Sequence, residues 1–100
     1  RDKVMLYELN NAFDLAARDD CVKVIILAAN GPHFSSGHDL SDRSGIQDFQ
    51  AVGNWGGFEK PGAEGRQAVE EEIYLGLCWR WRNLPKPTIA EVQGKVIAGG

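Results

Sequence analysis

The stretch that decides the fold is Val22–Leu40, VKVIILAANGPHFSSGHDL. Its first eight residues, Val22–Ala29, are rich in β-branched residues and almost all apolar. A strand that is buried on both faces has this composition, which indicates a parallel sheet. The turn residues Asn30-Gly31-Pro32 end the strand. The remaining residues, HFSSGHDL (33–40), form a loop with one glycine at its centre.

A helix is predicted on the N-terminal side of this strand, from about Lys3 to Arg18. Apolar residues recur there at helical spacing, which is typical of an amphipathic helix. They are Met5, Leu9, Phe13 and Ala16.

A second helix is predicted over Arg66–Leu84, where Val69, Ile73, Leu77 and Trp81 are spaced by four. The acidic run Glu70–Glu72 near its start interacts favourably with the helix dipole, and we interpret it as a solvated helix start. Trp79 and Trp81 differ by two positions, so we expect only one of them in the core.

A second buried strand is predicted over Thr88–Val92, followed by a turn at Gln93-Gly94 and small residues that we expect to open another helix. The order of helix, strand, loop, helix, strand and loop predicts an α/β fold with a parallel sheet. Ligands bind at the carboxyl ends of strands in such sheets. Both glycine-bearing loops follow strands and therefore lie at such ends.

The segment 41–65 is predicted to be a mobile loop or lid with one helical turn near 46–52. It is rich in glycine, and loops of this length usually have a function or are disordered. Phe49, Trp55 and Phe58 favour a lid that packs over something apolar. A surface loop with its own small core is the alternative.

The composition is that of an ordinary globular protein, with 43% hydrophobic and 25% charged residues. No apolar run approaches the roughly 18–20 residues of a membrane span, and no signal peptide is expected. The net charge of −3 comes without a basic stripe, so we expect no nucleic-acid partner. Cys21 and Cys78 are interpreted as reduced structural thiols, which fits the cytoplasm.

The two glycine-bearing loops could serve chemistry on an acyl thioester. Enolisation of a thioester puts negative charge on its carbonyl oxygen, and two preorganised main-chain N–H groups can hold that charge. Such donors need close approach, which small residues permit. Gly37 lets the first loop turn, so that His38 could offer one N–H group, and Gly99 could offer the other.

These loops carry a family resemblance. HFSSGHDL (33–40) resembles the crotonase-superfamily motif of aromatic, small, small, Gly, any residue, Asp and hydrophobic. KPTIAEVQG (86–94) resembles the Lys-Pro-x-Ile-Ala-x-Val-x-Gly strand of the enoyl-CoA hydratase/isomerase family, and the run to Gly99-Gly100 resembles its second oxyanion turn. The resemblance covers essentially residues 1–100. It implies that they are part of a single crotonase-like domain, an α/β core of ββα spiral type that is incomplete at both ends.

The resemblance implies that the main-chain N–H groups of His38 and Gly99 are the catalytic oxyanion donors. The backbone of residues 35–38 would lie along the adenine and pantetheine end of coenzyme A, and Leu40 would border the acyl pocket. The implied substrate-binding residues are Ser35, Ser36, Gly37, His38, Asp39, Leu40 and Gly99.

The resemblance further implies an acyl-CoA substrate and an enoyl-CoA hydratase-like lyase that hydrates a 2-enoyl-CoA. An isomerase, a hydrolase and a dehalogenase remain open, as do a non-catalytic acyl-CoA-binding relative and an interaction module with merely structural glycine turns. No metal and no cofactor beyond the coenzyme A of the substrate are expected. The family's assembly is a homotrimer or hexamer.

The sequence departs from the family pattern at several positions. Ala98 stands where the family has the first glycine of its second turn, so a slight shift of that turn is expected. Lysines that flank the first motif in many hydratases are replaced by Pro32 and Ser41, which leaves Arg43 or residues outside the chain to meet the coenzyme A phosphates. The family's two catalytic glutamates lie downstream of this turn. We therefore expect the isolated 100-residue chain to be inactive.

Other readings of the first loop are less favoured. Ser36, His38 and Asp39 are neighbours in one loop, whereas the members of a catalytic triad converge from distant positions. A metal site at His38, Asp39 and Asp42 lacks further ligands. We expect Asp39 to cap a following helix or brace the loop, the His38 side chain to face solvent, and His33 to have no role.

Overall fold

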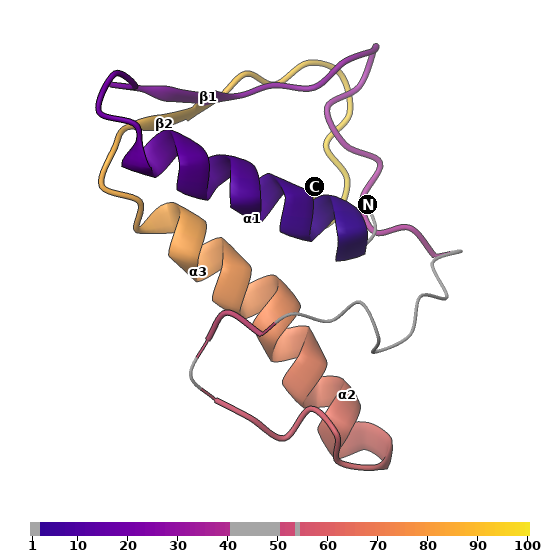
Figure 1. Cartoon of the computed structure of the whole chain (residues 1–100). Helices are drawn as coiled ribbons and strands as arrows, with labels where there is room; N and C mark the ends of the chain where they lie inside the picture. Colours follow the sequence, from indigo (N-terminus) through magenta and orange to yellow (C-terminus); the bar gives the residue numbers. More distant parts are fainter. Residues whose placement is uncertain (1–2, 41–50, 54) are drawn as a thin grey trace.

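A computed structural model describes residues 3–40, 51–53 and 55–100 of the chain. The helices are α1 (Lys3–Arg18), α2 (Gly62–Glu70), the π-helical turn η2 (Glu71–Gly76) and α3 (Leu77–Arg82). The strands are β1 (Ile25–Leu27) and β2 (Thr88–Ala90). In Figure 1, α1 lies beneath the two strands, and α2, η2 and α3 form one long rod that descends from the sheet. The predicted order of helices and strands is confirmed, and so are the bounds of α1.

The two strands form the predicted parallel sheet. Ile25 pairs with Thr88, Ile26 with Ile89, and Leu27 with Ala90. The prediction that both strands are buried on both faces is wrong for this chain, since Ile26 is 62% exposed and Ile89 is 55% exposed. Burial of these side chains would need a further layer packed on them, and none covers them within the described residues.

The core lies between α1 and the long helical rod. Leu6 and Tyr7 of α1 pack with Ile73 of η2 and Leu77 of α3. Of the apolar residues predicted to line α1, Phe13 is buried, but Met5 is 45% exposed. The buried face of α1 is centred on Leu6, Tyr7, Asn10 and Phe13 because this is the side that meets α3.

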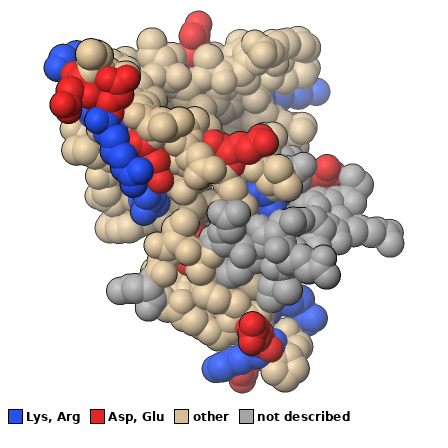
Figure 2. All heavy atoms as spheres, in the orientation of Figure 1, with Lys and Arg blue, Asp and Glu red and all other residues tan. Residues whose placement is uncertain are grey.

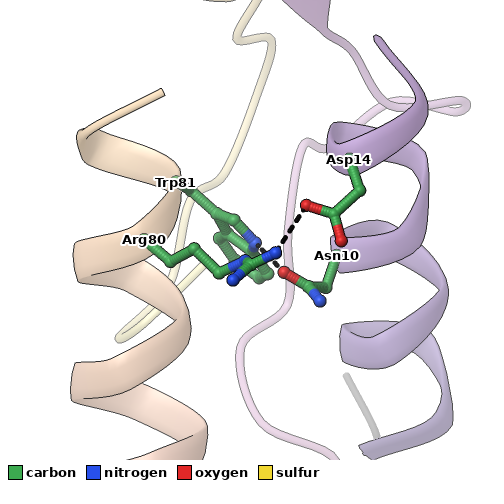
Figure 3. A network of polar contacts seen from close by, with 4 residues as sticks. All are labelled: Asn10, Asp14, Arg80 and Trp81. Atoms are coloured by element: carbon green, nitrogen blue, oxygen red, sulfur yellow. Dashed lines mark hydrogen bonds and ion pairs between the residues drawn. The ribbon is translucent and has the colours of Figure 1, made fainter. Parts of the chain in front are cut away.

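A polar network joins α1 to α3 (Figure 3). The indole Nε1 of Trp81 donates to Oδ1 of Asn10 at 3.1 Å, and the Trp81 ring lies 5.3 Å from that of Phe13. Arg80 pairs with Asp14 at 2.7 Å. Trp81 is therefore the half-buried member of the tryptophan pair, whereas Trp79 is 64% exposed, as the spacing predicts.

The second helix begins at Gly62, four residues before the predicted start, and contains the π-helical turn η2. Its acidic run is only partly solvated. Glu70 and Glu71 are exposed, but Glu72 is fully buried, so the predicted solvated start is wrong at this residue. The reason is that segment 51–53 packs against the helix there, and Oε1 of Glu72 accepts hydrogen bonds from the N–H groups of Val52 and Gly53.

Lys86 fixes the end of α1 to the start of β2. Its ammonium group donates to the main-chain carbonyl of Ala16 at 2.7 Å and to that of Asp19 at 2.6 Å. A cation at the C-terminus of a helix satisfies its last carbonyls and complements its dipole. This contact ties the segment that leads into β2 to the C-terminal end of α1.

The described surface carries charges of both signs. Figure 2 shows lysine and arginine side chains beside aspartate and glutamate side chains on the face drawn, with wide uncharged areas between them. Within the described ranges, no helix combines the length and the apolar character that crossing a membrane requires. The predictions that concern Ser41, Asp42, Arg43 and Phe49, and most of the predicted turn near 46–52, lie outside the described residues.

Candidate functional site

The two glycine-bearing segments lie side by side beyond the ends of β1 and β2. Ser35 and Val96 form a parallel bridge. The N–H group of Ser35 donates to the carbonyl of Lys95 at 3.1 Å, and the carbonyl of Ser35 accepts from Ile97 at 3.1 Å. The two segments lie far apart in the sequence and meet because the parallel register brings both strand ends to the same edge of the sheet.

Gly37 packs closely against the second segment. Its φ is 89°, a region that disfavours residues with a Cβ atom. A Cβ atom on Gly37 would lie 3.0 Å from the carbonyl oxygen of Ile97 and 3.7 Å from the Cβ of Ala98. The Oγ atom of Ser35 accepts the N–H of Gly37 at 3.1 Å. The residue that precedes His38 thus packs against the residue that precedes Gly99.

The second segment forms a tight turn. The N–H group of Gly100 donates to the carbonyl of Ile97 at 2.9 Å and closes the turn. Ala98 takes the left-handed conformation that a glycine would take, with φ at 51°. Gly99 lies at the exposed tip of this turn.

The side chain of His38 faces the helical rod. The residue is exposed, and its ring meets Tyr74 of η2 edge to face, with 6.1 Å between ring centroids and 84° between ring planes. Sequence reasoning did not single out Tyr74, because its helix position carries no chemical signature. The π-helical turn that contains Tyr74 is itself a feature often found at functional sites.

A cavity of about 420 Å³ lies behind the first loop. It is mostly apolar, and its lining includes the predicted residues Ser35, Ser36 and Gly37 together with Gly100. The remaining lining residues come from α1, the end of β1 and the loop start, and they are Met5, Leu9, Leu27, Ala28, Ala29, His33 and Phe34. Asp39 is half-buried, and Leu40 is 92% exposed and lies outside this lining.

Side chains also form hydrogen bonds between the two segments. Nδ1 of His33 accepts the N–H of Lys95 at 3.1 Å. Nε2 of Gln93 donates to the carbonyls of Ala29 at 2.7 Å and Gly31 at 3.1 Å. The expectation that His33 has no role misses this contact, because a lone loop histidine carries no sequence signal for the segment it will meet.

The contacts between the two segments are mainly main-chain contacts, and they do not bring together a set of ionisable side chains. In residues 3–40, 51–53 and 55–100, no three His, Cys, Asp or Glu side chains come together in a way that could hold a metal ion. Stabilisation of a developing anion by N–H groups is the chemistry that such a backbone site can perform.

The chain resembles known proteins over nearly its whole length. The sequence profile of the family described as enoyl-CoA hydratase/isomerase matches residues 2–100. The chain is 44% identical over 102 residues to EchA13, a candidate enoyl-CoA hydratase of Mycobacterium tuberculosis, covering 96% of this chain and 32% of that protein. It is 35% identical over 98 residues to the mitochondrial enoyl-CoA hydratase domain-containing protein 3 of Rattus norvegicus, covering 96% and 27% of the two chains.

A solved structure agrees with these relatives. The crystal structure of a candidate enoyl-CoA hydratase from Mycobacterium smegmatis superposes with a TM-score of 0.76 at 43% identity, covering 99% of this chain and 34% of that one. The chain thus spans about a third of the length of the proteins it matches. The profile match over nearly every residue and the shared fold confirm the resemblance drawn from the two motifs, and the chain belongs to the enoyl-CoA hydratase/isomerase family of the crotonase superfamily.

Proposed function

We propose that the full-length protein acts on acyl-CoA thioesters and holds the thioester oxygen with the main-chain N–H groups of His38 and Gly99. The observation that carries the proposal is the packing of Gly37 against Ile97 and Ala98. This contact brings together the residues that precede the two donors. Family membership and the relatives' names support the substrate class.

The reaction we propose is the hydration of a 2-enoyl-CoA. The oxygen of water bonds to Cβ while one O–H bond of the water breaks and its proton passes to a base, a role that the family resemblance gives to a glutamate downstream of residue 100. The electrons of the Cα–Cβ double bond move toward the thioester, which becomes an enolate. Its oxygen then carries the negative charge until Cα takes a proton. Two N–H groups fixed in advance stabilise this oxygen without reorganisation, and a single such donor is worth about 10²–10³ in rate in other enzymes.

Further parts of the proposal rest on the family resemblance. Ser35, Ser36 and Gly37 would border the coenzyme A, with Asp39 bracing the loop and Leu40 beside the acyl group. No metal and no cofactor beyond the coenzyme A of the substrate takes part. The protein works in the cytoplasm as a homotrimer or hexamer.

The test is a hydration assay with the full-length protein, following the near-ultraviolet absorbance that a conjugated enoyl thioester loses when water adds. Gly99→Pro deletes the N–H group and should lower kcat by roughly 10²-fold or more. Gly99→Ala keeps that group and serves as the matched control. Equal losses in the two variants, with circular dichroism unchanged, would count against a donor at Gly99.

A further inference from the structure

The contact between His33 and Lys95 is the part of this site that the proposed chemistry does not use. Lys95 is held from two sides by the first loop. Its carbonyl accepts the N–H groups of Phe34 and Ser35, each at 3.1 Å, and its own N–H donates to Nδ1 of His33 at 3.1 Å. Any sequence can form the two main-chain bonds, whereas the third depends on the histidine.

Gly94 shows how tightly this contact is built. The φ of Gly94 is 61°. A Cβ atom there would lie 2.1 Å from the carbonyl oxygen of Pro32 and 2.4 Å from Nδ1 of His33. Only glycine at residue 94 leaves room for the imidazole ring of His33 to accept the N–H group of Lys95.

The position of Lys95 sets the position of the second turn. Two residues later, the N–H group of Ile97 bonds the carbonyl of Ser35, and the turn from Ile97 closes on Gly100. Gly99 lies inside that turn. A displacement of Lys95 would therefore reach the proposed oxyanion donor four residues later through the hydrogen-bonded backbone between them.

We infer that His33 is a positioning residue, whose Nδ1 atom holds the second oxyanion turn in register with the first loop. The inference rests on the proposed function, since it gives His33 a role through the N–H of Gly99. An imidazole that accepts at Nδ1 is in the neutral form with its proton on Nε2. The side chain required at residue 33 is thus a hydrogen-bond acceptor at the Nδ1 position.

The experiment compares three variants of the full-length protein at His33. His33→Asn places an amide oxygen near the Nδ1 position, His33→Gln places one near the Nε2 position, and His33→Ala removes the acceptor. We expect the alanine and glutamine variants to lose roughly 10- to 100-fold in kcat, because misplacing a catalytic group by about 1 Å has costs of this order. KM should change little, since the lost interaction belongs to the transition state. The asparagine variant should recover most of the rate.

Amide hydrogen exchange at Lys95 tests the contact without any turnover. Exchange should accelerate in His33→Ala and His33→Gln and return toward the wild-type rate in His33→Asn. Unchanged exchange in all three, or wild-type kcat in His33→Ala, would overturn the inference. Lack of turnover in the wild-type protein would overturn the proposed function instead, while the exchange rates would still show whether His33 holds Lys95.

Discussion

Ala98 takes a backbone conformation that the family gives to glycine. Its φ of 51° lies in the left-handed region, where a Cβ atom costs roughly 1–2 kcal/mol. The sequence departs from the family pattern at this residue, and alanine stands there in a conformation that glycine adopts more readily. The N–H group of Ile97 donates to the carbonyl of Ser35, and that of Gly100 donates to the carbonyl of Ile97. These two bonds hold the strained residue in place.

This strain predicts an order of stability for variants of Ala98. Ala98→Gly should leave the free energy of unfolding unchanged or raise it by up to about 1 kcal/mol, because relief of strain offsets the greater freedom of the unfolded chain. Ala98→Val should lower it by more than about 1 kcal/mol, since a β-branched side chain tolerates positive φ least. Urea denaturation of the full-length protein measures both.

Ala90 offers a matched control, because it lies in the extended strand β2. Valine should be tolerated better than glycine there, which reverses the order expected at Ala98. The same order at both positions would show that residue 98 is not held in the left-handed conformation.

At the scale of elements, the sequence predicted what periodicity can reveal. The spacing of Val69, Ile73, Leu77 and Trp81 identified the packed face of the second helix, since Ile73 and Leu77 are buried and the other two pack against them. It could not reveal the π-helical turn or the burial of Glu72. An acidic run near a helix start has the pattern of a solvated face, and only the packing of segment 51–53 reverses that at one residue.

Burial of Glu72 predicts a large effect of its removal. Its Oε1 atom is the acceptor for the N–H groups of Val52 and Gly53, so Glu72→Ala leaves both without this acceptor. A typical hydrogen bond contributes about 0.5–1.5 kcal/mol, and we expect the loss of two to lower the free energy of unfolding by about 1–3 kcal/mol. Amide exchange at Val52 and Gly53 should accelerate at the same time.

The neighbouring Glu71 is exposed and supplies the control. Glu71→Ala should change stability by no more than about 0.5 kcal/mol, as surface substitutions usually do. If Glu71→Ala and Glu72→Ala behaved alike in urea denaturation, the contact of Glu72 with segment 51–53 would be excluded as a source of stability.

At the scale of the whole molecule, two loops that are distant in sequence meet, as their motifs predicted. Parallel pairing of β1 with β2 is enough for this, because it brings the carboxyl ends of both strands, and the loops that follow them, to the same edge of the sheet. Burial of the strands was not predictable in the same way. Whether a strand is covered depends on what packs on each face, and the outward side chains Ile26 and Ile89 face solvent in this chain. A hydrophobic strand pattern predicts that the strand is buried, but it does not identify the segment that packs on each face.

This exposed sheet face leads to a prediction for the 100-residue chain produced alone. Ile26 and Ile89 are paired neighbours in the sheet and present a contiguous apolar surface. The isolated chain should bind an environment-sensitive hydrophobic dye more strongly than the full-length protein does, and it should not hydrate enoyl-CoA. Turnover by a purified chain of verified mass would contradict this.

The most direct test of the oxyanion account measures the stretching frequency of the thioester carbonyl bond, which the two N–H groups should polarise. An enoyl-CoA with a ¹³C-labelled thioester carbonyl, bound to the full-length protein, should show its carbonyl stretch at lower frequency than in water in an isotope-edited infrared difference spectrum. The shift should shrink in Gly99→Pro and persist in Gly99→Ala. A carbonyl frequency equal to that in water, or one that Gly99→Pro leaves unchanged at full occupancy, would contradict the account.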